Sequence, residues 1–225
     1  MSRKVTARQN SRDGLNLENH PSVLASRHPA NPGSASEDSA QLVFGPDDRV
    51  QVTNTLGFPA RAVAQILVRF TAGPDDFGTG FFVGPDLVLT AAHVFSQPGR
   101  SVAFIRVIPG RNGAASAPFG FADTRWFRPS AAWTPAMAPE ADFGGIKLAQ
   151  PLGNTVGFLG LHVFTDAELA ATFDVVGYPT DKPPGTMWDH RGAVTPSPSF
   201  LTYQMDTTGG QSGAPVFAAF ANGIF

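Results

Sequence analysis

The sequence predicts an all-β protein, either an antiparallel barrel or a sandwich. Its 225 residues include 24 Gly and 20 Pro, almost a fifth of the chain, and both residue types disfavour helix interiors. Short apolar runs alternate with turn-forming residues from Leu42 onward, a spacing typical of antiparallel sheets. Only residues 165–171 (TDAELAA) carry a helical pattern, in which Thr165 and Glu168 have the spacing of a capping box.

The chain changes character near Leu42. Residues 1–41 are polar and show neither a strand period nor a helix period, so they are interpreted as a disordered leader or propeptide. Beyond them, Gly, Pro and Asp separate a series of apolar runs that are predicted as strands. The predicted strands are residues 62–70, 80–83, 87–91, 102–108, 142–148, 173–177, 187–194, 200–205 and 214–217.

Composition excludes several classes of function. A net charge of −2 gives no electrostatic case for nucleic acid or an anionic membrane as a partner. No apolar run reaches the roughly 18 residues that a membrane span requires. The absence of Cys removes disulfides, thiolate zinc sites and cysteine nucleophiles. No cofactor is expected, although a structural calcium ion at Asp47/Asp48 or Asp75/Asp76 is left open.

Three motifs carry candidate catalytic residues. Residues 87–93 (LVLTAAH) form an apolar strand that leads to His93, and residues 141–148 (ADFGGIKL) place Asp142 before another strand. Residues 206–216 (DTTGGQSGAPV) frame Ser212 with glycines. The order His, Asp, Ser is that of the chymotrypsin-type triad and differs from the subtilisin and α/β-hydrolase orders.

Each residue type has a chemical reason to be in such a triad. A serine hydroxyl needs a base to take its proton during attack, and histidine titrates near neutrality. A buried carboxylate on the other ring nitrogen fixes the tautomer of the histidine. The N–H groups of Gly210 and Ser212 are predicted to bind the oxyanion that develops during the reaction.

Taken singly, each motif has a simpler explanation. His93 could be a packed core residue, Asp142 a turn residue, and residues 209–213 a glycine-rich turn. Their common order, at strand boundaries 49 and 70 residues apart, favours a catalytic cleft between two halves of the molecule. The remaining histidines, interpreted as leader, loop or surface residues, are His20, His28, His162 and His190.

With these motifs, the chain resembles the glutamyl endopeptidase (V8-like) branch of the trypsin-fold serine proteases. The resemblance extends over residues 42–225, interrupted by variable loops. The segments that carry it are residues 43–59 (VFGPDDRVQVTNTLGFP), 78–95 (GTGFFVGPDLVLTAAHVF), 142–148 (DFGGIKL), 175–188 (VVGYPTDKPPGTMW) and 206–217 (DTTGGQSGAPVF).

The resemblance implies two antiparallel β-barrels with the active site between them. The N-terminal barrel would span residues 42–135, and residues 136–225 would hold a linker and the C-terminal barrel. It also implies a secreted, monomeric endopeptidase that cleaves protein or peptide substrates after Glu or Asp. His93 would be the base, Asp142 its orienting carboxylate and Ser212 the nucleophile.

The resemblance further implies residues of the substrate pocket. Gly210 would belong to the oxyanion hole and Thr207 to the pocket. Val43 would lie near the mature N-terminus, which helps to hold the acidic substrate side chain, so the leader would be removed before Leu42 or Val43. Gln211 stands where vertebrate trypsin-like enzymes have an aspartate that pairs with the freed N-terminus, so that ion pair is not expected.

Two departures leave alternatives open. The acid-binding histidine of the family lies about fifteen residues beyond the serine, but the sequence ends thirteen residues beyond Ser212, so the second barrel is expected to be truncated. Asp206 lies six residues before Ser212, where trypsin-like enzymes have the carboxylate that attracts Arg or Lys. The alternatives are therefore a protease that cleaves after Arg or Lys through Asp206, or a catalytically silent peptide-binding barrel.

Overall fold

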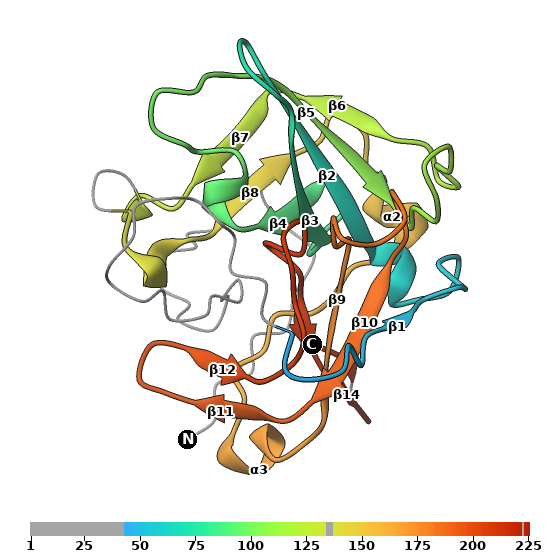
Figure 1. The fold of residues 1–225 in the computed structure, drawn as a ribbon, viewed down its shortest axis with the longest axis vertical. Coiled ribbons are helices and arrows are strands. Elements are labelled where there is room, and N and C mark those ends of the chain that lie inside the picture. Colours follow the sequence, from blue (N-terminus) through green and yellow to red (C-terminus); the bar gives the residue numbers. More distant parts are fainter. Residues whose placement is uncertain (1–42, 134–136, 222) are drawn as a thin grey trace.

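The computed structural model describes residues 43–133, 137–221 and 223–225, and its chain path is shown in Figure 1. The predicted leader, residues 1–41, lies outside the described residues, as do Leu42, His20 and His28. The described part is mostly β, with two short α-helices, α2 (Gly153–Val156) and α3 (Asp166–Leu169). Three 3-10 helices accompany them: η2 (Ala60–Ala62), η3 (Ala92–Val94) and η4 (Pro139–Ala141).

The first half is a seven-stranded antiparallel sheet in the order β6-β5-β2-β3-β4-β8-β7, in the upper part of Figure 1. The strands are β2 (Val63–Phe70), β3 (Asp76–Phe82), β4 (Leu87–Thr90), β5 (Val102–Pro109), β6 (Ala122–Thr124), β7 (Trp126–Pro129) and β8 (Gly144–Lys147). Only Arg125 separates the two edge strands β6 and β7 in sequence, so the sheet curls until its edges meet. The Thr124 hydroxyl joins them by accepting a hydrogen bond from Trp126 N and donating one to Lys147 O.

The interior of this barrel is filled by aliphatic and aromatic side chains from its strands. Fully buried members include Ile66, Phe82, Ile105 and Ile146, each of which is contributed by a different strand. Removing this apolar surface from water, at about 25 cal/mol per Å², is the main contribution to the stability of the barrel.

The second half contains the four-stranded sheet β1-β10-β9-β13 and two hairpins, in the lower part of Figure 1. The strands of the sheet are β1 (Val50–Gln51), β9 (Phe173–Gly177), β10 (Trp188–Gly192) and β13 (Val216–Phe217). The hairpins are β11 (Val194–Pro196) with β12 (Leu201–Tyr203), and β14 (Ala219–Phe220) with β15 (Gly223–Ile224). Phe173, Val175, Tyr203 and Met205 form the centre of its core.

The structure agrees with most of the predicted strands and with the single predicted helix. Residues 173–177 form β9 with the predicted bounds. At α3, Thr165 Oγ1 accepts from Glu168 N while the Glu168 carboxylate accepts from Thr165 N at 2.8 Å, so the predicted capping box is present. Strands β1, β6, β7, β14 and β15, and residues 195–196 of β11, were not predicted, because these runs of two to four residues carry no apolar period.

The expected division at residues 135/136 does not coincide with the division between the sheets. β8 lies beyond that boundary, yet it pairs with β4 and β7 of the first sheet. β1 precedes the first barrel in sequence, yet it pairs with β10 of the second sheet. The reason is backbone hydrogen bonding, because β4 needs a partner on its second side and residues 144–147 supply it.

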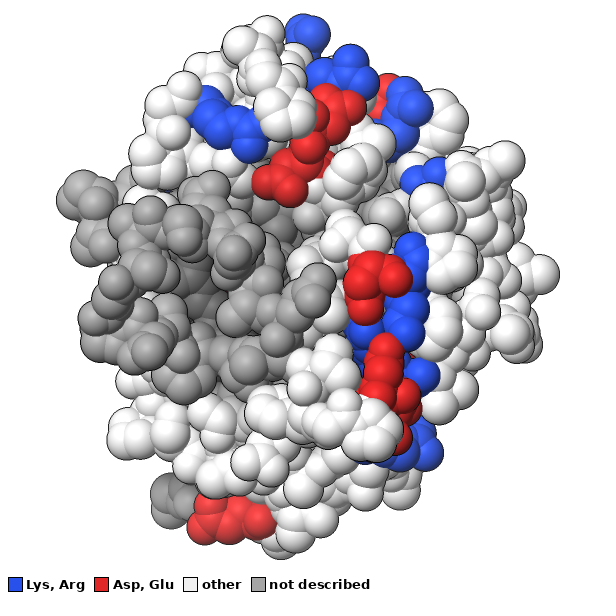
Figure 2. All heavy atoms as spheres, viewed as in Figure 1, with Lys and Arg blue, Asp and Glu red and all other residues white. Residues whose placement is uncertain are grey.

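Charged side chains of both signs lie close together on the surface. On the face seen in Figure 2, Lys and Arg are interspersed with Asp and Glu, and the described residues of this face form no large patch of one sign. In the described part of the chain, no helix has the length and apolar character needed to cross a bilayer.

Candidate active site

His93 and Asp142 are in direct contact. Asp142 Oδ2 lies 2.7 Å from His93 Nδ1, and Asp142 Oδ1 accepts a hydrogen bond of 2.9 Å from the His93 backbone N–H. The Asp142 side chain is almost completely buried, whereas that of His93 is 30% exposed. The carboxylate therefore occupies Nδ1 and leaves Nε2 as the ring nitrogen that can exchange a proton with a bound molecule.

The fold explains why these two residues meet. His93 lies in η3, directly after β4, and Asp142 follows η4, directly before β8, which pairs with β4. Ala92 and Ala141, their immediate neighbours, are buried together with Trp133 in a small apolar cluster. The pairing of two adjacent strands thus places the histidine and the carboxylate side by side.

Ser212 lies between two glycines with left-handed backbone conformations. Gly210 has φ +87° and Gly213 has φ +82°, values that a residue with a side chain adopts at a cost. Two consecutive turns surround the serine, closed by hydrogen bonds from Gln211 N to Thr208 O and from Ala214 N to Gln211 O. We call residues 208–213 the serine loop.

The serine loop packs against the strand that leads to His93. A Cβ atom on Gly213 would lie 2.2 Å from Thr90 Oγ1 and 2.6 Å from Ala91 N, so only glycine fits here. Among the described residues, no hydrogen bond joins Ser212 Oγ to His93 Nε2. Such catalytic contacts are often long in ligand-free sites and shorten when substrate binds.

Thr79 of β3 fixes the orientation of two peptide groups in the serine loop. Its hydroxyl donates to Gly210 O and its N–H donates to Ser212 O, both at 2.8 Å. Within the described residues, the N–H groups of Gly210 and Ser212 themselves donate to no protein acceptor. They are therefore available to a ligand oxygen, as a predicted oxyanion hole requires. No sequence motif had pointed to Thr79.

Asp206 is buried, and both of its carboxylate oxygens are occupied by the N-terminal segment. Oδ1 accepts from Phe44 N at 2.8 Å, and Oδ2 accepts from Asp48 N at 3.0 Å. Neighbouring Thr207 is half-buried, and Val43, directly before Phe44, is 37% exposed. The structure thus brings the predicted residues Val43 and Asp206 into one region through Phe44.

His190 does not have the loop or surface position expected from the sequence. It lies in β10 with only 15% of its side chain exposed, and its Nδ1 accepts a hydrogen bond from Asp206 N at 2.8 Å. An acceptor role for Nδ1 places the proton of the neutral ring on Nε2. The interpretation of His190 from sequence was wrong because β10 contains few apolar residues and does not show its burial.

A buried arginine lies behind the serine loop. The Arg49 guanidinium donates to Asp47, Asp181, Thr208 and Gln211. Its hydrogen bond lowers the pKa of Asp47 below its usual range, against the opposing effect of burial. Burial acts to raise the pKa of Asp181, but hydrogen bonds from Arg49 and Thr208 outweigh it and lower that pKa.

The described residues contain no group of three or more His, Asp or Glu side chains placed to hold a metal ion. Three of the four carboxylates left open for calcium have other partners. Asp47 binds Arg49 and Lys182, Asp75 pairs with Arg69, and Asp76 accepts from Gln97 at 2.7 Å.

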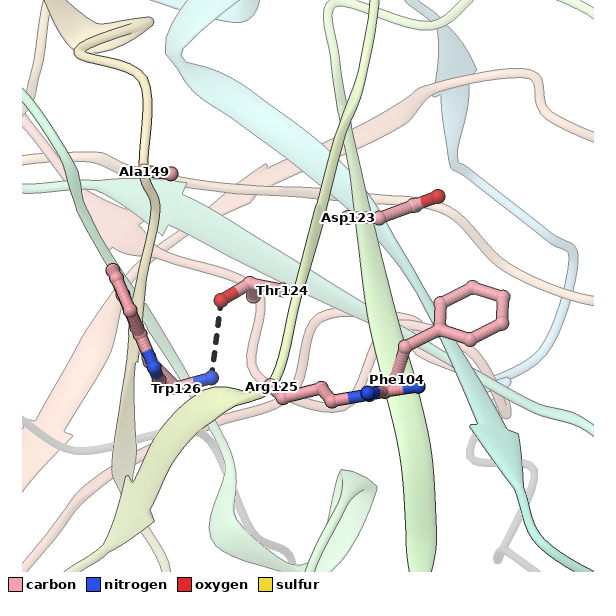
Figure 3. Close-up of a pocket in the computed structure, with 6 residues that line it drawn as sticks. All are labelled: Phe104, Asp123, Thr124, Arg125, Trp126 and Ala149. Atoms are coloured by element: carbon pink, nitrogen blue, oxygen red, sulfur yellow. Dashed lines mark hydrogen bonds between the residues drawn. The ribbon is translucent and has the colours of Figure 1, made fainter.

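A pocket of about 460 Å³ lies on the first barrel (Figure 3). Phe104, Trp126 and Arg125 line it together with Asp123, Thr124 and Ala149. His93, Asp142 and Ser212 are not among these lining residues, so the pocket is not the candidate active site.

Comparison with known families decides the classification. The family model for the trypsin-like peptidase domain matches residues 78–222, which include His93, Asp142 and Ser212. The chain belongs to the trypsin-like peptidase family. The resemblance noted in the sequence is therefore confirmed.

Among curated relatives, the glutamyl endopeptidase of Bacillus licheniformis is 41% identical over 183 residues, covering 80% of this chain and 55% of that protein. A protein of Bacillus subtilis named extracellular metalloprotease is 35% identical, covering 80% of this chain and 58% of that protein. The chain thus spans a little over half the length of these relatives.

A solved structure confirms the fold of this trypsin-like peptidase. The structure of a Glu endopeptidase in complex with MPD matches with a TM-score of 0.69 at 28% identity, covering 81% of this chain and 90% of that chain. The predicted fold class, all-β with two antiparallel barrels of the trypsin-like fold, is confirmed.

Proposed function

We propose that this protein is a serine endopeptidase in which His93, Asp142 and Ser212 form the catalytic triad. The observation that carries the proposal is the double contact between Asp142 and His93, on a strand end against which the serine loop packs. Family membership supports it, since the matched region contains all three residues.

The geometry supports an acyl-enzyme mechanism. Ser212 Oγ attacks the carbonyl carbon of the substrate while His93 Nε2 takes the hydroxyl proton, and Asp142 stabilises the imidazolium that forms. The N–H groups of Gly210 and Ser212 bind the oxyanion. His93 then gives its proton to the leaving amine as the C–N bond breaks. Water, activated by His93, hydrolyses the ester and restores Ser212.

We propose cleavage after Glu, and more weakly after Asp. Two observations support this specificity: the 41% identity to a glutamyl endopeptidase, and the contacts of Asp206. A carboxylate that binds a substrate Arg or Lys must face the pocket, but both oxygens of Asp206 are occupied by backbone N–H groups of residues 44 and 48. Thr207 and the segment that begins at Val43 are the proposed pocket residues.

We further propose that residues 1–41 form a leader that is removed before Leu42 or Val43, and that the enzyme is a secreted monomer acting on protein or peptide substrates. The attachment of Phe44 to Asp206 supports the position of the cut, because it holds the proposed new N-terminus beside the pocket. N-terminal sequencing of active enzyme checks the cut, and active enzyme that still begins at Met1 would contradict it.

The test of the proposed function uses peptides that differ only in the residue before the scissile bond: Glu, Asp, Gln, Lys or Arg. After removal of residues 1–41, cleavage after Glu by the purified protein, and none by its identically treated Ser212→Ala variant, is the expected result. Cleavage after Lys or Arg would instead support the alternative role of Asp206. A protein without any Ser212-dependent cleavage would fit the peptide-binding alternative.

The Bacillus subtilis relative is named a metalloprotease, so a second experiment tests whether cleavage by this protein depends on a metal ion. Serine-dependent hydrolysis should persist after treatment with a metal chelator and stop after phosphonylation of Ser212. Activity that disappears with chelation and returns with a divalent cation would contradict the proposed mechanism.

A further inference from the structure

The side chain of Arg49 lies at the junction of three chain segments. The guanidinium is completely buried and donates to Asp47 in its own segment and to Asp181 in the turn after β9. It also donates to Thr208 Oγ1 at 3.0 Å and to Gln211 Oε1 at 3.3 Å in the serine loop. A planar guanidinium can bind several acceptors in fixed directions, unlike a lysine ammonium.

The contact with Gln211 is directional. Gln211 Oε1 also accepts from Thr208 N at 3.1 Å, so its carbonyl oxygen faces two donors. Its amide nitrogen Nε2 is buried and has no partner within the described residues. Rotating the amide would place Nε2 against the guanidinium and lose both bonds, so Arg49 and Thr208 together fix the orientation of this side chain.

Gln211 is adjacent to both predicted oxyanion donors in sequence. It follows Gly210 and precedes Ser212, and its own N–H closes the first turn of the serine loop by donating to Thr208 O at 3.1 Å. The Gln211–Ser212 peptide group carries the Ser212 N–H, so a shift of Gln211 rotates that donor directly, and it also moves Gly210, to which Gln211 is bonded. A displacement of about 1 Å in such a site can cost about 100-fold in rate.

We propose that Arg49 is a positioning residue for the oxyanion hole, acting through Gln211. The Arg49 guanidinium is held by two carboxylates and is therefore a fixed hydrogen-bond donor to Gln211, the residue before Ser212. This inference rests on the proposed peptidase activity, since it assigns a role in the same site. Loss of the Arg49–Gln211 contact is expected to weaken binding of the transition state and to change substrate binding little.

The first test compares Arg49→Gln with Arg106→Gln, a control on the first barrel whose guanidinium binds the carboxylate of Asp123 through two nitrogens. Arg49→Gln is expected to lower kcat by about 10- to 100-fold with KM changed by less than about threefold. Affinity for a peptide aldehyde, which forms a tetrahedral adduct with the serine, should fall with kcat. Arg106→Gln should remain within about twofold of the wild type.

If Arg49→Gln does not fold, a second pair of variants at Gln211 tests the proposal. These variants leave the ion pairs of Arg49 intact. Gln211→Leu removes the acceptor and is expected to lower kcat as Arg49→Gln does. Gln211→Glu keeps an acceptor oxygen and is expected to recover most of that loss.

Three outcomes are possible. The expected losses in kcat and in aldehyde affinity would support the proposal. Wild-type kcat in folded Arg49→Gln or Gln211→Leu, or an effect confined to KM, would overturn it. A wild-type protein that shows no Ser212-dependent cleavage would overturn the proposed function itself, and with it this inference.

Discussion

Asp142 binds His93 twice, through the ring nitrogen Nδ1 and through the backbone N–H of the same residue. The second bond fixes the carboxylate relative to the main chain of His93, so the acceptor for Nδ1 stays in place and any rotation of the ring away from it loses a hydrogen bond. The imidazole is thereby held with Nε2 free for proton transfer.

Replacing the carboxylate by an amide tests this relationship. Asp142→Asn keeps the shape of the side chain but favours the wrong tautomer of His93, so kcat/KM at neutral pH should fall by about 10⁴-fold. Steady-state kinetics on a Glu-containing peptide measures the loss. Ser212→Ala, expected to lose about 10⁶-fold in kcat, sets the background, and an Asp142→Asn enzyme within tenfold of wild type would contradict the triad.

Gly213→Ala should prevent correct folding of the serine loop. A Cβ atom would lie within 2.6 Å of Thr90 Oγ1, Thr79 O and Ala91 N, in addition to the positive φ. We expect a loss of more than about 4 kcal/mol in the free energy of unfolding. Gly99→Ala is the matched control, because Gly99 also has a positive φ, of +72°, but has open space around it. That variant should lose only about 1–2 kcal/mol in chemical denaturation.

Asp189 should make stability depend on pH. Burial, with a further contribution from the charge of Asp174, raises the pKa of Asp189 to about 7. The folded state therefore binds a proton more tightly than the unfolded state between about pH 4 and 7, and stability falls as pH rises through that range. Asp189→Asn should raise Tm relative to wild type at pH 8, with a smaller gain at pH 5.

Asp123→Asn serves as the control for that measurement. The Arg106 guanidinium lowers the pKa of the Asp123 carboxyl, so its contribution to stability is present at neutral pH and is lost as the pH falls through the folded-state pKa. Its removal should lower Tm slightly at pH 8, the opposite sign. If Asp189→Asn changed Tm by the same amount at pH 5 and at pH 8, the raised pKa of Asp189 would be contradicted.

Asp206→Asn should weaken the attachment of the N-terminal segment, to which the proposed pocket residue Val43 belongs, without lowering any cleavage after Lys. The amide loses the charge and one acceptor that bind Phe44 N and Asp48 N, so Tm and resistance to limited proteolysis should fall. KM for Glu peptides should rise, because that segment contributes to the proposed pocket, and any cleavage after Lys should stay unchanged. A variant that loses cleavage after Lys would show that Asp206 is a pocket residue. Thr207→Val, by comparison, is expected to raise KM for Glu peptides.

Structure could be predicted from the sequence where it depends on residues within a single short segment. β9 was predicted with its bounds because all five of its residues are buried, and the capping box of α3 lies within four residues. The His, Asp and Ser motifs were visible because each joins a strand end to a residue with distinctive chemistry. Strands β6 and β7 were missed, since their position depends on closure of the barrel by pairing with β5 and β8.

The supporting residues of the site could not be predicted, because their partners are remote in sequence. Arg49 and Thr208 are 159 residues apart, and Thr79 and Gly210 are 131 residues apart. His190 appears in the sequence as one polar residue among several. Without an expected topology, no pattern of residue types indicates which polar side chains will be buried together.

Thr79 has a wider consequence for the behaviour of the whole molecule. It belongs to the first barrel, yet it hydrogen-bonds Gly210, Ser212 and Tyr178 of the second half. Separation of the two halves would therefore break hydrogen bonds that hold the serine loop in its conformation. Thermal inactivation and exchange of the Thr79 amide hydrogen should then report the same opening of the contact between the two halves, which precedes global unfolding. A molecule is expected to be active only while the Thr79 hydrogen bonds are formed.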